Sequence, residues 1–197
     1  MTQRLSAEER RQEIAEAVLR LAGQEGFHRL TTALIAKSIG VSEATLFRHF
    51  QDKQDIITAA LRRFEELVMA DFPPKEEHPL EALRAFFFQR IALIRKHPEI
   101  KSLAFNVQLL QIASEESAER ISFCIGQMFQ FIFSSLQQAQ EQRMIASDLP
   151  LEVFLWSFLG VLRGYTDQIQ AAPPTPQDEA YSKTLWLGLE QLLRRSK

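Results

Sequence analysis

Residues 32–50 read TALIAKSIGVSEATLFRHF, and this stretch predicts two short helices joined by a sharp turn. Ala36 is small enough for the two helices to cross closely, and Gly40 stands where the backbone between them needs a positive φ. Ser42 can then cap the second helix at its N-terminus. The spacing is typical of a helix-turn-helix, although an ordinary helical hairpin in an all-α core would carry similar turn signals.

The second of these helices has two different faces. Leu46 and Phe50 are four residues apart, so they share the face that we expect to be buried. Ala44, Thr45 and Arg48 share the opposite face. A helix with small or polar side chains and one arginine on its free face fits the major groove of DNA, where arginine can bind a guanine edge through two hydrogen bonds.

The overall charge neither favours nor excludes a nucleic-acid partner. The chain has 197 residues and a formal net charge of −2, so it carries no general positive field. Between residues 28 and 53, however, four Lys and Arg side chains stand against two Asp and Glu side chains. DNA binding would therefore depend on the local placement of charge and on helix N-termini.

The cysteine content and the hydropathy pattern predict a cytoplasmic protein without a membrane partner. Cys124 is the single cysteine, which excludes an internal disulfide, and its apolar neighbours indicate a buried, unreactive thiol. Arg and Glu dominate the first turns, which is not the pattern of a signal peptide. No apolar run approaches the roughly 20 residues that span a bilayer.

The whole chain carries helix signals and no alternating strand pattern, so we expect an all-α fold of about nine helices. Glycine and proline are few, with 7 and 8 residues, which favours helix over sheet. The expected helices begin near Ser6, Thr32, Glu43, Asp52, Leu80, Glu99, Ser117, Pro150 and Thr175.

Residues 26–57 resemble the TetR family of bacterial transcriptional regulators. The residues that carry the resemblance are Gly26, Thr32, Ile35-Ala36, Gly40-Val41-Ser42, Thr45-Leu46-Phe47, His49-Phe50 and Lys53. The rest of the chain matches the family only in length and in helix order. The resemblance implies a homodimer that binds a palindromic DNA operator and is released by a small ligand. It also implies a three-helix DNA-binding domain over residues 1–54 and a larger effector-binding and dimerisation domain over residues 55–197.

The resemblance assigns the DNA contacts position by position. Thr32 and Lys53 would hold phosphates at the starts of two helices, and Phe47 and His49 would lie against the DNA backbone and the groove edge. The recognition helix would be lined by Ser42, Ala44, Thr45 and Arg48.

The chain departs from the family at two of these positions, and three roles have a simpler alternative. Phe47 replaces a frequent tyrosine and so lacks its hydroxyl, and Arg48 replaces a frequent aromatic residue. Thr32 could instead be only a helix cap, His49 could pack at a helix end, and Lys53 could be a solvated charge.

Phenylalanine is concentrated in the C-terminal part, where 12 of the 15 Phe residues follow residue 55. Successive Phe residues point in different directions, so all could be ordinary core or some could line a cavity. The resemblance favours an apolar cavity for a small hydrophobic effector among the helices from residue 80 to residue 165. Arg90 and Arg163 are polar groups that could orient a ligand, although an ion pair is an equal explanation for Arg163. The candidate ligand-binding residues are Phe87, Phe105, Leu109, Phe123 and Arg163.

The last two helices carry more apolar side chains than one small core can cover. A homodimer built as a four-helix bundle would cover the second apolar face. The side chains concerned are Phe154, Trp156, Phe158, Leu159, Leu162, Trp186, Leu189 and Leu193.

These observations favour a ligand-responsive transcriptional repressor. The alternative is a DNA-binding structural or adaptor protein without a small effector, and a filled core would favour it over a cavity. We expect no enzyme activity, no cofactor and no metal site. The sequence has no glycine-rich phosphate loop and no Ser–His–acid set, and its four histidines are scattered.

Overall fold

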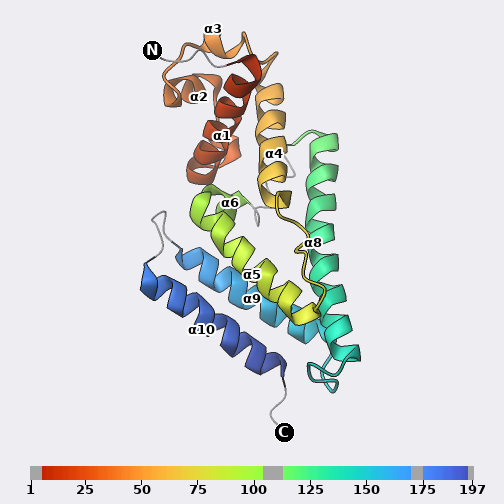
Figure 1. Cartoon of the computed structure of the whole chain (residues 1–197). Helices are drawn as coiled ribbons and strands as arrows, with labels where there is room; N and C mark the ends of the chain where they lie inside the picture. The colour runs from red at the N-terminus through yellow and green to blue at the C-terminus, as the bar shows by residue number, and fades with distance from the viewer. Residues whose placement is uncertain (1–5, 104–112, 170–174, 195–197) are drawn as a thin grey trace. The chain divides into compact units, whose positions relative to one another are not determined.

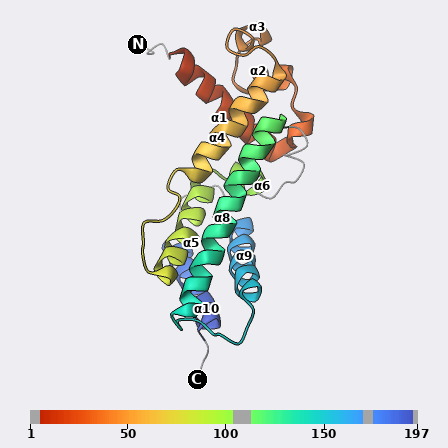
Figure 2. The ribbon, with the colours of Figure 1, turned by 90° about the vertical axis from the view of Figure 1, so that its right-hand side faces the viewer.

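The computed structural model describes residues 6–103, 113–169 and 175–194, and these residues form an all-α structure (Figures 1 and 2). Nine α-helices and one short 3-10 helix cover the described ranges, which contain no strand, so the predicted fold class is confirmed. The elements are α1 Ala7–Glu25, η1 Phe27–Arg29, α2 Thr32–Ser38, α3 Glu43–Leu46, α4 Lys53–Met69, α5 Pro79–Lys96, α6 Glu99–Leu103, α8 Glu115–Glu141, α9 Leu151–Gln168 and α10 Pro176–Leu193.

The chain divides into two compact units. The first contains residues 1–70 and 99–124, and the second contains residues 71–98 and 125–197. Helix α4 packs along α1 inside the first unit. The functional boundary between residues 54 and 55 stays a prediction, because packing alone does not say which residues bind DNA or an effector.

The first unit is built on α1, which packs against α4 and α6. Val18 on α1 and Leu61 on α4 are almost fully buried. An ion pair joins the same two helices nearer the surface, where Arg63 donates from Nη2 to Glu16 Oε1 at 2.8 Å. Apolar burial therefore fixes α4 against α1, and burial of such side chains contributes most of the free energy of packing.

The second unit has an aromatic core formed by α5, α8 and α9, with α10 packed on α9. The Phe86 ring lies 5.5 Å from the Phe131 ring and 6.2 Å from the Phe158 ring. Phe87, the next residue on α5, contacts Phe158 and Trp186 of α10. Adjacent phenylalanines of α5 thus contribute to one continuous core.

Two helix starts show why local sequence patterns were reliable here. The Ser6 hydroxyl accepts a hydrogen bond from the Glu9 N–H at 3.1 Å, and the Glu9 carboxylate accepts one from the Ser6 N–H. Thr175 and Asp178 form the same reciprocal arrangement at the start of α10. Both predicted starts are confirmed, because a capping box is decided by residues three apart in the sequence.

Several helix ends differ from the sequence-based expectation. The second helix of the helix-turn-helix was expected over residues 43–50, but α3 ends at Leu46 and residues 47–49 continue as tight turns. Helix α4 ends at Met69, four residues before Pro73-Pro74, the nearest helix-breaking residues in the sequence. Helix α8 begins at Glu115 rather than Ser117, because the Ser114 hydroxyl accepts from the Ser117 N–H and acts as the cap.

Candidate DNA-binding site

The turn between α2 and α3 has the geometry predicted for it. Gly40 has a φ of 69°, a left-handed conformation that glycine adopts without steric cost. The Val41 N–H donates to the Ala36 carbonyl at 3.0 Å, and Ala36 is buried where α2 meets α3. A larger side chain at residue 36 would push the two helices apart, so the small residue and the glycine together fix their crossing.

Helix α3 presents a polar face whose side chains are linked by hydrogen bonds. The Ser42 hydroxyl accepts from the Thr45 N–H at 3.2 Å and therefore caps α3 as predicted. The Ser42 and Thr45 hydroxyl oxygens are 3.0 Å apart, and Arg48 Nη2 donates to the Thr45 hydroxyl at 3.4 Å. Ala44 and Arg48 are exposed. The face that was predicted to be free is therefore free, and it is small and polar apart from one cation.

The opposite face of the recognition segment is buried. Leu46 is 0 % exposed and Phe50 is 2 % exposed, so both residues belong to the core of the first unit. The Phe50 N–H donates to the Leu46 carbonyl at 3.2 Å, which keeps the segment helical beyond the end of α3. The burial of Leu46 and Phe50 is confirmed, and the binding of DNA by the opposite face stays a prediction.

Thr32 does not cap α2. That role falls to Thr31, whose hydroxyl accepts from the Leu34 N–H at 3.1 Å. Thr32 is the first residue of α2, and its hydroxyl donates to the carboxylate of Glu43, at the first position of α3. The expectation that Thr32 could serve as a cap is wrong, because two adjacent threonines left the start of the helix ambiguous by one residue.

The remaining predicted DNA contacts lie at the end of the recognition segment and the start of α4. Phe47 is exposed, His49 is half-buried and Lys53 is exposed as the first residue of α4. Asp52 caps α4 by accepting from the Asp55 N–H at 2.8 Å. Lys53 is thus the first residue of α4, at the end of the helix where the helix dipole favours an anion.

One residue of this region was missed by sequence reasoning. Arg11 on α1 donates to the backbone carbonyl of His49 and to the carboxylate of Asp55. These partners are 38 and 44 residues away along the chain, so no local pattern signals the contact.

The predicted ligand-binding residues occupy different environments. Phe87 is fully buried in the aromatic core of the second unit, Phe123 is 66 % exposed on α8, and Arg163 pairs with Asp167 one helical turn away at 2.7 Å. Phe105 and Leu109 lie outside the described residues. The ion pair that was the alternative explanation for Arg163 is present in the structure.

Arg90 is the one strongly buried cation in the described part of the second unit. Its guanidinium lies 5.1 Å from the centre of the Phe86 ring, and Nη1 lies 3.8 Å from the Met128 sulfur. Burial lowers the pKa of Arg90 to about 10, so the side chain stays charged at neutral pH.

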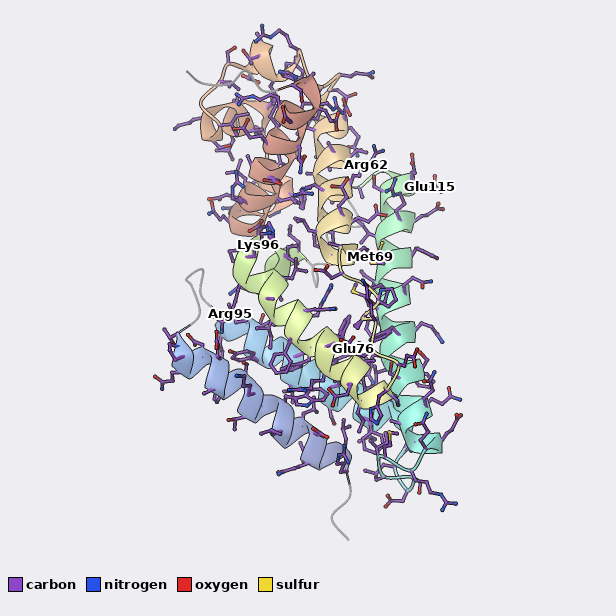
Figure 3. The ribbon with its side chains drawn as sticks, in the orientation of Figure 1. Arg62, Met69, Glu76, Arg95, Lys96 and Glu115 are labelled. Atoms are coloured by element: carbon purple, nitrogen blue, oxygen red, sulfur yellow. The ribbon has the colours of Figure 1, made fainter. Side chains whose placement is uncertain are left out.

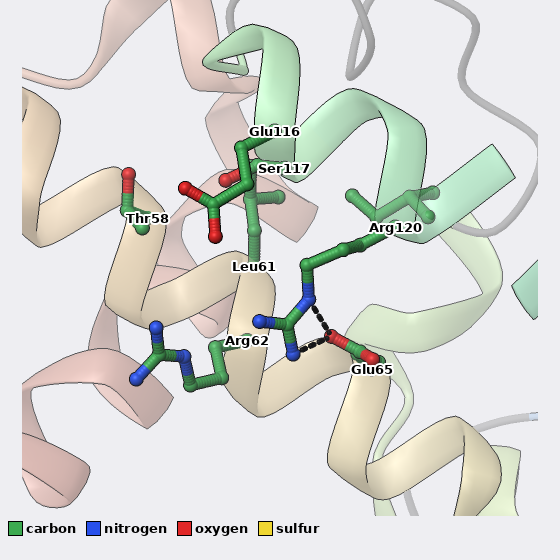
Figure 4. Close-up of a pocket in the computed structure, with 8 residues that line it drawn as sticks. Thr58, Leu61, Arg62, Glu65, Glu116, Ser117 and Arg120 are labelled. Carbon is green, nitrogen blue, oxygen red and sulfur yellow. Dashed lines mark hydrogen bonds and ion pairs between the residues drawn. The ribbon is translucent and has the colours of Figure 1, made fainter. Parts of the chain in front are cut away.

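A small polar pocket lies between α4 and the start of α8 in the first unit (Figure 4). It is crossed by the ion pair in which Arg120 donates from Nε and Nη2 to Glu65 at 2.9 and 2.6 Å. Figure 3 labels Arg62 and Glu115 at the two sides of this region. The lining residues are Thr58, Leu61, Arg62, Glu65, Glu116, Ser117, Arg120 and Ile121.

Cys124 is buried near the Arg120–Glu65 ion pair. Burial raises the pKa of its thiol, as expected for an unreactive cysteine.

Residues 6–103, 113–169 and 175–194 contain no group of His, Cys, Asp and Glu side chains that could hold a metal ion. None of the helices described there is long and apolar enough to cross a membrane.

The fold and the exposed face of α3 define a DNA-binding helix-turn-helix protein. Residues 14–60 match the model of the bacterial regulatory proteins of the tetR family. The nucleoid occlusion factor SlmA of Vibrio campbellii is 30% identical over 163 residues, covering 79% of this chain and 81% of that protein. SlmA of Vibrio cholerae is 31% identical over 140 residues, covering 69% of each chain.

Solved structures of low sequence identity share the fold. The ketosteroid transcriptional regulator KstR2 of Mycobacterium tuberculosis has a TM-score of 0.81 at 19% identity and covers 98% of both chains. AibR in complex with isovaleryl coenzyme A and operator DNA has a TM-score of 0.73 at 20% identity, covering 93% of this chain and 97% of that one. The chain belongs to the TetR family. It is therefore a DNA-binding transcriptional regulator, and the expectation that it is not an enzyme is confirmed by its family.

Proposed function

We propose that the chain is a homodimeric repressor that binds a palindromic operator and is released by a small hydrophobic effector. The observation that carries this proposal is the polar face of α3. There the Ser42 cap accepts from the Thr45 N–H, and the exposed Arg48 donates to the Thr45 hydroxyl. A rigid, small and polar helix face with one arginine is suited to base recognition in a major groove.

The DNA contacts divide into two kinds. Arg48 and Thr45 read bases, with Ser42 and Ala44 allowing close approach to the groove. Thr32 and Lys53 hold phosphates on either side, and Phe47 and His49 lie against the DNA backbone. Thr32 has to exchange the Glu43 carboxylate for a phosphate oxygen as DNA binds, since its hydroxyl donates to Glu43 in the free protein. On this proposal residues 1–54 read DNA, and residues 55–197 dimerise and bind the effector.

Exposed apolar side chains on α9 and α10 support a dimer. Trp156 is 64 % exposed and Val153 is exposed on α9, while Leu187 and Leu192 are exposed on α10. Large apolar side chains gathered on the faces of two helices indicate an interface. Two copies of α9 and α10 would cover these side chains as a four-helix bundle and would place two recognition helices on two half-sites.

The second unit supports an effector of hydrophobic character. Phe87 and Arg163 of this unit remain proposed ligand-binding residues. Phe105, Leu109 and Phe123 fall in the first unit and stay predictions. The AibR neighbour binds isovaleryl coenzyme A, a ligand that combines a short apolar acyl chain with anionic phosphates. We expect a cytoplasmic effector with an apolar part that aromatic side chains such as Phe87 would contact. Its binding would weaken operator affinity by a coupling of about 1–3 kcal/mol.

The curated relatives favour a second candidate. They are named nucleoid occlusion factors at about 30% identity, a higher identity than that of the solved structures. A DNA-binding structural or adaptor function without a small effector is the corresponding alternative for this chain.

Selection of bound duplexes from a random DNA pool, followed by a screen for compounds that release the protein, tests the proposal. The expected result is one enriched palindrome and release by an apolar acid or acyl thioester. Enrichment of a palindrome with no release by any compound of this class would favour the second candidate. Failure to enrich any palindrome would contradict the proposed repressor.

A further inference from the structure

Arg11 on α1 contacts three consecutive parts of the DNA-binding region. Its guanidinium donates from Nη1 to the carbonyl of His49 and from Nη2 to Asp55 Oδ1 at 3.1 Å. The guanidinium carbon lies 4.3 Å from the centre of the Phe50 ring. One side chain therefore reaches the end of the recognition segment, its buried anchor and the first turn of α4.

Asp55 extends this contact to the link between the recognition segment and α4. Its second oxygen, Oδ2, accepts from the Gln51 N–H at 3.1 Å, and its own N–H is held by the Asp52 cap. The Asp55 carboxylate thus joins Arg11 to the backbone of the link. We call Arg11, His49, Phe50, Gln51 and Asp55 the Arg11 brace.

The brace lies at the carboxyl end of the recognition segment, beyond the last residue of α3. Helix α3 is four residues long, and the residues that follow it up to Phe50 are held by a mixture of i→i+3 and i→i+4 backbone hydrogen bonds. The last carbonyls of a helix have no partner within the helix, and a cation near them is stabilising. The guanidinium supplies both a donor and a positive charge at this end.

We propose that Arg11 is a positioning residue for DNA recognition. It holds the carboxyl end of the recognition segment at a fixed angle to α1 and α4, so that Arg48 and Lys53 meet a base and a phosphate at the same time. Arg11 reaches the DNA only through the residues that it positions. Without the brace, a smaller fraction of molecules presents the binding-competent arrangement, and the apparent affinity falls by that fraction.

The chain provides a matched control. Arg63 on α4 pairs with Glu16 on α1, so it also ties α1 to α4 by a guanidinium and a carboxylate. The exposed fractions are comparable, with 33% and 30% for the side chains of Arg11 and Asp55 and 21% and 32% for Arg63 and Glu16. Only Arg11 also bonds a backbone group of the recognition segment, the His49 carbonyl. Comparing the two arginines therefore distinguishes positioning of the segment from a general loss of stability.

The test compares Arg11→Lys with Arg63→Lys on a duplex selected by the wild-type protein. Lysine keeps the charge in both variants but cannot bridge two acceptors with a planar fork. We expect Arg11→Lys to bind the selected duplex about tenfold more weakly, with an unchanged slope of affinity against salt concentration. Asp55→Asn should reproduce this loss, and Arg63→Lys should leave the affinity within about twofold.

Hydrogen exchange provides a readout that needs no DNA. Exchange of the amides from Thr45 to Phe50 should become faster in Arg11→Lys and stay unchanged in Arg63→Lys. The two variants should have equal midpoints of unfolding, so that global stability does not explain the difference. Equal affinity and equal exchange in the two variants would overturn the proposal. A salt slope that falls by about one in Arg11→Lys would also overturn it, because Arg11 would then be a direct phosphate contact.

Discussion

Arg48 is the residue on which sequence recognition depends in this account. Its side chain is exposed on α3, and its guanidinium is 3.4 Å from the Thr45 hydroxyl, which orients it along the free face of the helix. An arginine held in this way can form two hydrogen bonds with a guanine edge.

Arg48→Ala should therefore relax sequence preference. We expect a loss of about 1–3 kcal/mol on the selected palindrome and a much smaller loss on random duplex, measured by fluorescence anisotropy. The physical reason is that a base contact contributes only where its base is present. Equal losses on both duplexes would contradict the assignment of Arg48 to a base.

Lys53→Ala should weaken binding to every DNA sequence. Lys53 lies at the N-terminus of α4, where its charge and the helix dipole act on the same phosphate. The plot of log affinity against log salt concentration should lose about one unit of slope, because one fewer counterion is released. An unchanged slope would contradict the phosphate contact and would indicate that Lys53 is only a solvated charge.

Gly40→Ala tests the turn itself. The φ of 69° at Gly40 is unfavourable for alanine, and there is open space around the position, so strain is the only expected cost. We expect a loss of about 1–2 kcal/mol in the free energy of unfolding by urea. Gly126→Ala is the matched control, because Gly126 also has open space but lies within α8, where alanine should be neutral or stabilising. A stable Gly40→Ala variant would contradict the strained turn.

The residue-scale predictions succeeded where a contact is local in the sequence. Ser42 caps α3 and Asp52 caps α4 because each cap bonds a residue three positions ahead. Arg11 could not be found in this way, since its partners His49 and Asp55 are 38 and 44 residues away in the sequence. The Thr31 cap was missed for a different reason, because either of two adjacent threonines satisfied the pattern equally well.

At the scale of elements, the type of each described helix was predicted better than its ends. Helix α3 is shorter than its hydrophobic pattern suggested, since Leu46 and Phe50 bury the same face whether or not the residues between them are fully helical. The apolar stripes of α9 and α10 were visible in the sequence. The pattern could not say which apolar side chains stay uncovered in a single chain, because that depends on the packing of α5 and α9.

Trp156→Glu should dissociate the proposed dimer. Trp156 is among the most exposed large apolar residues of α9 and α10 in the single chain. In the proposed four-helix bundle it would be buried. An unpaired glutamate there would therefore destabilise the dimer by several kcal/mol. Sedimentation equilibrium should show a monomer, with operator affinity reduced to that of one recognition helix. Gln130→Glu, on an exposed polar position of α8, is the control and should leave the dimer intact. A Trp156→Glu variant that remains a dimer would move the interface away from this face of α9.

At the scale of the whole molecule, α4 crosses the proposed boundary between residues 54 and 55, and α8 crosses the boundary between the two units. Lys53 begins α4 at the proposed DNA surface, and Glu65, three turns later, pairs with Arg120 of α8. Helix α8 starts in the first unit, and its residues from 125 onward belong to the second. The sequence could not indicate this ion pair, because Glu65 and Arg120 are 55 residues apart and each resembles an ordinary surface charge.

The central claim is that two copies of α3, paired by a dimer, read two half-sites at a fixed spacing. Insertion of about five base pairs between the half-sites of the selected palindrome turns one half-site to the opposite side of the DNA. The account predicts that the affinity for this duplex falls to that for a single half-site. An affinity equal to that for the original palindrome would contradict it.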